Sequence, residues 1–139
     1  MDVLVLIGRI LFCVLFLNSA VGHLTKTKAM AGYAGSRGVP APAAAVLGSG
    51  CLLLAGGLMV AFGVWADLGA LLLVGFLLPT AFLMHAFWKE TAEPSKTMEM
   101  VGFLKDLSLA GAGLMLFAFF SYAGHDLGLT LTGPLFHIS

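Results

Sequence analysis

Charge is the scarcest property of this sequence. Only 10% of its 139 residues are Asp, Glu, Lys or Arg, whereas about a quarter of the residues in an ordinary soluble domain are charged. So few charges cannot cover the surface of a soluble globule, and with 60% hydrophobic residues the natural solvent of the chain is lipid. Seven basic residues are balanced by seven acidic ones, so the basic excess that nucleic-acid binding requires is missing. High hydrophobicity also excludes intrinsic disorder.

Cysteine is nearly absent too. Cys13 and Cys51 are the only two and form no Cys-x-x-Cys pair, which argues against a membrane thiol oxidoreductase, because that chemistry needs an accessible thiolate with a resolving partner. We expect both to be small buried residues. Cys51 falls in a stripe of small residues that predicts close helix packing in lipid, and the stripe consists of Ala44, Gly48, Cys51 and Ala55. The sequence holds no four-residue metal-binding constellation.

Apart from Arg9 in the first of them, long stretches without charge divide the chain into four apolar segments. About 20 apolar residues cross a bilayer as a helix, so we predict spans at residues 3–23, 43–63, 67–88 and 104–122. The segments lack the alternation of barrel strands, and backbone amides in hydrocarbon must be satisfied internally, so all four should be helices. The first should be a retained helix rather than a secretory signal, because no basic residue precedes its core. The predicted fold class is all-α, a single integral membrane domain folded as an up-down four-helix bundle.

The basic residues are distributed unevenly between the two sides of this bundle. The first and third connections, with the start of the fourth span, carry Lys26, Lys28, Arg37, Lys89, Lys96 and Lys105. The other side carries only Arg9. By the positive-inside rule the two basic connections are cytoplasmic, and both chain termini are predicted to lie outside.

The tail after the fourth span, residues 124–139, is too short to cross a membrane and has no Lys or Arg. It still carries six large apolar residues, which are Leu127, Leu129, Leu131, Leu135, Phe136 and Ile138. We expect these residues to lie against the membrane surface, the bundle or another subunit, and we favour another subunit.

Three polar residues stand out within the predicted spans: Arg9, Asn18 and Asp67. An arginine inside a membrane is costly and usually faces the bundle interior, where it finds a partner. We therefore expect Arg9 to pair with Asp67 or Asp126, the acidic residues on its side of the membrane. The pair is interpreted as structural, or Arg9 as a snorkelling anchor, in preference to a contact with substrate.

A candidate site lies on the predicted cytoplasmic side, where three helices bring His23, His85, Lys105 and Asp106 to a similar depth. Pro79 removes a backbone hydrogen bond from the third span near His85, and a kink there can open a gap for a ligand. The alternative is that each histidine only hydrogen-bonds a neighbour while Lys105 and Asp106 begin a helix. Two histidines could also hold a haem iron, but no further motif accompanies them, so the sequence disfavours haem. No residue is assigned a catalytic role.

Several short motifs occur in an order that resembles the DoxX family. They are Gly8-Arg9-Ile10-Leu11, Gly22-His23-Leu24, Gly38-Val39-Pro40-Ala41-Pro42, Gly56-Gly57-Leu58 and Leu104-Lys105-Asp106-Leu107. DoxX-like proteins are small four-helix membrane proteins associated with quinone-linked sulfur oxidation and with membrane complexes that handle oxidative stress. The resemblance therefore implies a redox setting in a bacterial or archaeal cytoplasmic membrane.

The sequence departs from the family pattern in the second span. An acidic residue commonly precedes the paired glycines there, whereas this chain has Cys51-Leu52-Leu53-Leu54-Ala55. The missing carboxylate favours an accessory subunit that anchors or completes a quinone-linked complex. Its expected partners are the lipid bilayer and other subunits of that complex. A quinone headgroup is expected near His23 and His85. Two alternatives stay open. The first is a stand-alone quinone-linked oxidoreductase, which would need a flavin, iron–sulfur or dithiol motif that this sequence does not contain. The second is a small transporter or channel subunit, which would need a continuous polar path that this sequence also does not contain.

Overall fold

The chain is all-helical throughout the part that its computed structural model describes, residues 1–137. Four helices are long and apolar enough to cross a membrane, which confirms the predicted all-α fold class with four spans. The α-helices are α1 (Asp2–Thr25), α2 (Thr27–Ser36), α3 (Pro42–Phe62), α4 (Ala66–Met84) and α5 (Glu93–Ala123), and two short 3-10 turns are η1 (Phe87–Lys89) and η2 (Gly124–Asp126).

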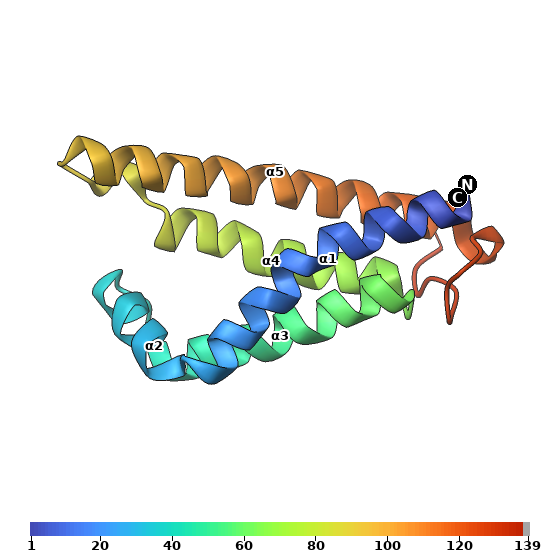
Figure 1. The fold of residues 1–139 in the computed structure, drawn as a ribbon, viewed down its shortest axis with the longest axis horizontal. Coiled ribbons are helices and arrows are strands. Elements are labelled where there is room, and N and C mark those ends of the chain that lie inside the picture. Colours follow the sequence, from blue (N-terminus) through green and yellow to red (C-terminus); the bar gives the residue numbers. More distant parts are fainter. Residues whose placement is uncertain (138–139) are drawn as a thin grey trace.

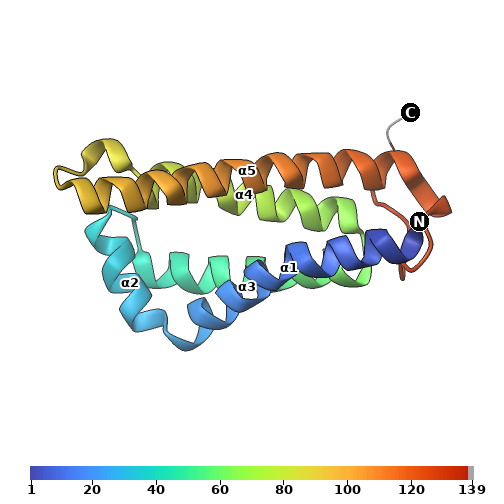
Figure 2. The same cartoon turned by 45° about the horizontal axis from the view of Figure 1, so that its top comes forward.

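The spans α1, α3, α4 and α5 are arranged as two antiparallel pairs. α1 packs mainly on α3, α5 packs on α4, and contacts between α3 and α4 join the pairs. Figures 1 and 2 show the first residues of α1 and the last residues of α5 at one end of the molecule, with α2 and the α4–α5 connection at the other. α1 lies close to α5 near the termini and diverges from it toward α2 in both views. The molecule is therefore wider at the α2 end.

Two helical segments differ from the sequence prediction. α2 occupies what we expected to be a linker, because its alanines favour helix and its Ala34 is buried. α5 begins at Glu93 rather than at residue 104, since an acidic residue and Pro94 in its first turn both favour a helix start. At 31 residues α5 is about 46 Å long, whereas the hydrocarbon core is about 30 Å thick, so its polar first turns extend beyond the apolar part of the span.

α3 packs through glycines rather than through the predicted stripe. An added Cβ on Gly50 would lie 2.9 Å from His23 Cβ of α1, and one on Gly57 would lie 2.9 Å from Leu17 Cδ2. The predicted stripe lies on the exposed face: Ala44, Gly48, Cys51 and Ala55. That prediction is wrong because glycine permits a closer approach than alanine or cysteine, and helix positions two apart face nearly opposite directions. Cys51 is therefore exposed, whereas Cys13 is buried as expected.

The tail folds back onto the chain at the end where the termini lie. Leu131 N donates to Phe62 O and to Gly63 O. The carboxylate of Asp67, at the start of α4, accepts hydrogen bonds from the backbone amides of Leu135, at 3.0 Å, and Phe136, at 2.6 Å. These backbone contacts lay the tail along the bundle, but four of its apolar side chains stay exposed, namely Leu129, Leu131, Leu135 and Phe136. Their expected contact with the membrane surface or another subunit stays a prediction. Ile138 lies outside the described residues.

Arg9 is buried, with 1% of its surface exposed, but its partner is not the one predicted. Its Nη2 donates to the carbonyl oxygen of Leu129 in the tail. Asp67 is fully buried and directs both oxygens to tail amides, and Asp126 is exposed. The expected pairing of Arg9 with Asp67 or Asp126 is therefore wrong. The tail backbone instead supplies a carbonyl acceptor for Arg9 and two amide donors for Asp67.

Candidate functional site

A pocket of about 670 Å³ opens between α1, α2, α3 and α4 at the wide end of the molecule. This volume is within the range of small-molecule sites. The walls are mostly apolar, with Phe76, Pro79 and Leu83 contributed by α4. The polar side chains among the lining residues are His23, Lys26, Tyr33, Ser49, Thr80 and His85. A ligand here would be mainly apolar with a few polar groups.

A smaller cavity of about 140 Å³ lies between α1, α4 and α5. The structure brings all four residues of the sequence-predicted site to its walls, namely His23, His85, Lys105 and Asp106. Ser19 adds another polar group. The large pocket and the small cavity share His23, Phe76, Thr80 and His85. The two histidines therefore stand between the large apolar pocket and a small cavity with a larger share of polar side chains.

His23 is held by the third helix. Its Nδ1 lies 2.8 Å from Ser49 Oγ and 3.2 Å from the carbonyl oxygen of Val46. Because the Ser49 hydroxyl donates its single hydrogen to Val46 O, its oxygen is left to accept from His23. This network assigns the ring proton of neutral His23 to Nδ1 and leaves Nε2 as the nitrogen that can accept a hydrogen bond from a ligand. Gly50 provides the space for this close approach of α1 to α3.

His85 follows the last residue of α4 and lies between two carboxylates of α5. Its Nδ1 is 2.8 Å from Glu99 Oε2, and its Nε2 is 3.7 Å from Asp106 Oδ2. Glu99 and Asp106 are seven positions apart, so they lie on one face of the helix. Gly102 stands between them, where an added Cβ would be 2.5 Å from His85 Nδ1. The ring can lie against α5 only because this position carries no side chain.

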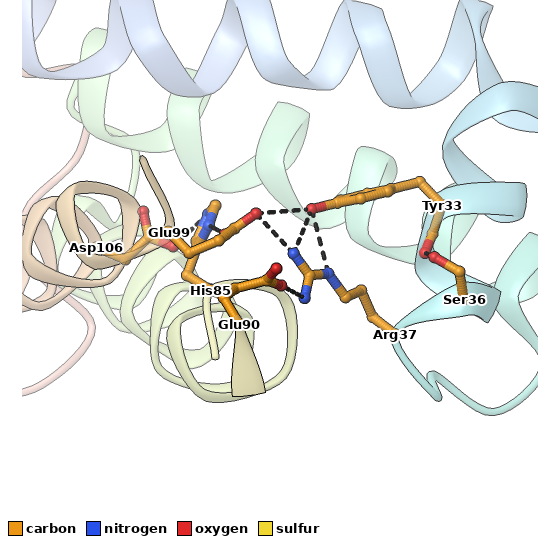
Figure 3. Close-up of polar contacts among 7 residues, drawn as sticks. All are labelled: Tyr33, Ser36, Arg37, His85, Glu90, Glu99 and Asp106. Atoms are coloured by element: carbon orange, nitrogen blue, oxygen red, sulfur yellow. Dashed lines mark hydrogen bonds and ion pairs between the residues drawn. The ribbon is translucent and has the colours of Figure 1, made fainter. Parts of the chain in front are cut away.

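A polar network at the wide end ties α2 to the α4–α5 connection, as Figure 3 shows. Arg37, directly after α2, makes ion pairs of 2.6 Å with Glu90 and with Glu99. The Tyr33 hydroxyl lies 3.1 Å from Glu99 Oε1 and accepts hydrogen bonds from the Arg37 guanidinium. These contacts to Tyr33 and Glu90 hold the pKa of Arg37 above its ordinary value. Glu99 therefore connects this network to His85.

Sequence reasoning missed the acidic members of this network. The sequence prediction used Arg37 only as a basic residue that sets the orientation in the membrane. It placed Glu90 and Glu99 in the connection between the third and fourth spans. The usable signal was the spacing of Glu99, Gly102 and Asp106, which places two carboxylates and a gap on one helical face.

The remaining polar residues of the predicted spans lie elsewhere. Asn18 is exposed and lines neither the large pocket nor the small cavity, because Phe16 and Ala20, two positions away on either side, face the core. Arg9 and Asp67 hold the tail at the opposite end. Within residues 1–137 no group of three or more His, Cys, Asp or Glu side chains could hold a metal ion.

Comparison with known proteins identifies a family. The DoxX family model matches residues 4–86, which is more than half of the chain. This stretch contains every residue that lines the large pocket and ends just after His85, so α5 with Glu99, Lys105 and Asp106 lies beyond it. No curated protein and no solved structure matches the chain.

Proposed function

Because the chain belongs to the DoxX family, we propose that it is an accessory subunit of a quinone-linked redox complex and binds the quinone headgroup in the large pocket. Its place is the cytoplasmic membrane of a bacterium or archaeon, with both termini outside. Its partners are the lipid bilayer and the subunits that carry electrons to the quinone.

The observation that carries this proposal is the position of His23 and His85 in an otherwise apolar pocket. A quinone has a flat apolar ring, two polar oxygens and an apolar tail, which matches a pocket with few polar groups. Nε2 of neutral His23 can accept a hydrogen bond from a hydroquinone hydroxyl. Nε2 of His85 lies 3.7 Å from Asp106 Oδ2, which is longer than a hydrogen bond, so an N–H there can donate to a quinone carbonyl. Phe76 packs edge-on against His23 and offers an aromatic surface beside it.

The accessory role is supported by what the sequence offers for electron transfer. No flavin, iron–sulfur or dithiol motif accompanies the pocket. Cys13 is buried in the core and Cys51 lies on the exposed face of α3, so the two thiols do not form a pair. Electrons for a bound quinone would then come from a partner subunit.

Quinone binding is tested with the full chain in lipid nanodiscs, by calorimetric titration with decylubiquinone and menadione. We expect saturable binding that weakens about fivefold in His23→Gln or His85→Gln, since one lost hydrogen bond is worth about 1 kcal/mol. His125→Gln is the matched control, because His125 is exposed and lies in η2 at the other end of the molecule. Absence of saturable binding, or equal affinity in all three variants, would refute the proposal.

The accessory role needs a separate measurement. A tagged chain purified from its own membranes in mild detergent should bring down a subunit whose absorption spectrum shows a redox cofactor. If the purified chain alone transfers electrons from a donor to quinone, the stand-alone oxidoreductase is the correct assignment. A chain that purifies alone and without such activity argues against both.

A further inference from the structure

Glu99, His85 and Asp106 form a line of titratable groups from the α2–α5 surface into the molecule (Figure 3). At the outer end, Glu99 Oε1 accepts hydrogen bonds from Arg37 and from the Tyr33 hydroxyl, and both of these side chains reach the surface. Its other oxygen meets His85 Nδ1 at 2.8 Å. The opposite ring nitrogen faces Asp106. The histidine therefore connects a carboxylate near the surface with one that is buried.

Asp106 is the unusual member of this line. It is buried, with 4% of its surface exposed, and among the described residues its Oδ2 has no hydrogen-bond partner. A buried carboxylate oxygen without a partner is costly, and a network that served only to hold helices together would be expected to satisfy it. The oxygen lies 3.7 Å from His85 Nε2, which is longer than a hydrogen bond.

The small cavity accounts for that unpaired oxygen. Asp106 lines it together with Ser19, Thr80 and Lys105, and its volume of about 140 Å³ is enough for several waters, each of which occupies about 30 Å³ in the liquid. A water that bridges Nε2 and Oδ2 would complete the line. Because the cavity shares His23 and His85 with the large pocket, its contents lie beside any ligand bound there.

We propose that Glu99, His85 and Asp106 form a proton path between the α2–α5 surface and the small cavity. Combined with the proposed function, the path would exchange protons with a quinone bound in the adjoining pocket. His85 is the central element, because each of its nitrogens faces a different carboxylate. Gly102 is a positioning residue, since it gives the ring its place on α5.

One transfer balances as follows. Protonated Glu99 gives its proton to Nδ1 of a His85 ring that carries hydrogen on Nε2, so an O–H bond breaks and an N–H bond forms. The Nε2–H proton then passes to Asp106 Oδ2, directly or through a water. The net result is one proton moved from Glu99 to Asp106 and one change of ring tautomer, with no electron transferred.

Charged and titratable groups from every neighbouring element surround His85, directly or through Glu99 and the large pocket. They are Glu99, Lys105 and Asp106 on α5, Glu90 in the connection, Tyr33 and Arg37 on the α2 side through Glu99, and His23 and Lys26 on the wall of the large pocket. Removing either carboxylate that faces the ring should therefore change how the ring is protonated.

Nitrogen-15 NMR of histidine-labelled protein in nanodiscs tests the path without any quinone. The four histidine signals are followed against pH, and His85→Gln identifies the signal of His85. We expect the Nδ1 and Nε2 shifts of His85, which report its tautomer, to change in both Glu99→Gln and Asp106→Asn. Glu93→Gln, an exposed carboxylate on the same helix, is the matched control and should change neither. If Asp106→Asn leaves the His85 signals as they are in the wild type, the path is refuted whether or not quinone binds.

A second measurement follows proton uptake when bound decylubiquinone is reduced by dithionite, which supplies the two electrons that accompany two protons. Glu99→Gln should slow this uptake by at least about tenfold, and the rate is measured at saturating decylubiquinone so that a change in quinone affinity does not affect it. Glu99→Asp, which keeps the carboxylate, should restore most of the rate and separates a path from a fault in folding. Normal uptake in Glu99→Gln would overturn the proposal, and absence of quinone binding would instead refute the proposed function.

Discussion

Gly102 determines where the His85 ring can lie, so it offers a single-residue test of the site. Gly102→Ala places a methyl group within 2.5 Å of His85 Nδ1, and the ring must leave its position between Glu99 and Asp106. We expect a loss of about 1–3 kcal/mol in stability, as for other overpacked contacts, together with weaker quinone binding. The measurements are thermal unfolding in detergent and titration with decylubiquinone.

Gly111→Ala is the control for this substitution. Gly111 lies on the same helix, and an added Cβ there meets no atom within 4 Å. Alanine favours helix more than glycine does, so this variant should be as stable as the wild type or slightly more stable. Equal behaviour of the two variants would show that the His85 ring does not need the gap.

Asp67 makes the second residue-scale prediction. Its two carboxylate oxygens accept hydrogen bonds from the backbone amides of Leu135 and Phe136. Asp67→Asn replaces one oxygen with an NH2 group, which cannot accept a hydrogen bond from the amide that faces it. Leaving a buried amide unsatisfied costs about 1–3 kcal/mol. We expect faster hydrogen exchange in residues 129–137, measured by mass spectrometry. Asp126→Asn changes an exposed carboxylate and should leave the exchange unaltered.

Arg9 shows what sequence can predict about one residue and what it cannot. Burial of an arginine in an apolar span requires a partner, and that much followed from residue type. The identity of the partner did not follow, because the carbonyl of Leu129 belongs to a tail whose path depends on Asp67, Gly63 and the α3–α4 turn. A backbone acceptor leaves no trace in the pattern of side chains.

At the scale of elements, α2 covers the large pocket and is tied to α5 through Arg37. Arg37→Gln removes ion pairs to Glu90 and Glu99, whose side chains are partly buried. We expect hydrogen exchange in residues 27–36 to increase about fivefold or more, since a charge-assisted pair contributes about 1–2 kcal/mol. Lys28→Gln, an exposed position on the same helix, is the control. Unchanged exchange in α2 would show that its packing on α3 alone holds it.

The same contact has a defined dependence on pH. Tyr33 and Glu90 raise the pKa of Arg37 above its ordinary value, so the stabilisation that its charge provides is fully present below that ordinary value. It would be lost only at a still higher pH. Slow exchange in α2 should therefore persist as the pH rises from 7 to 10, and a faster rate at pH 10, after correction for the intrinsic rate, would contradict this.

The elements that sequence predicted well are those whose cause is local. Charge-free runs gave α1, α3 and α4 close to their observed bounds, because the cost of placing charge in lipid applies residue by residue. α2 was not predicted, because its polar and small residues are also typical of a linker between two spans. The packing face of α3 was missed because Gly48 and Gly50 are alike in sequence, and only contact with His23 selects Gly50.

At the scale of the whole molecule, the family match ends next to His85, so the candidate site combines residues from inside and outside the matched stretch. The stretch matched by the DoxX family supplies all walls of the large pocket, and α5 adds the two carboxylates that face His85. The candidate site was therefore half predictable, because Asp106 lies in the first turn of the predicted fourth span. Glu99 could be found only once α5 was known to start at Glu93, which placed it on the same helix as Asp106.

The orientation of the molecule is the last prediction, and it decides which side of the membrane the proposed proton path faces. The basic connections on which the positive-inside rule rests lie at the α2 end with Glu99, so that end should be cytoplasmic. In a Cys51→Ala background, where the remaining Cys13 is buried, Ser36→Cys should react with an impermeant maleimide only after cells are permeabilised. Asp126→Cys, at the opposite end, should react in intact cells. The reverse pattern would put the termini inside and make Glu99 exchange protons with the outer medium, so that protons taken up by a bound quinone would come from outside the cell.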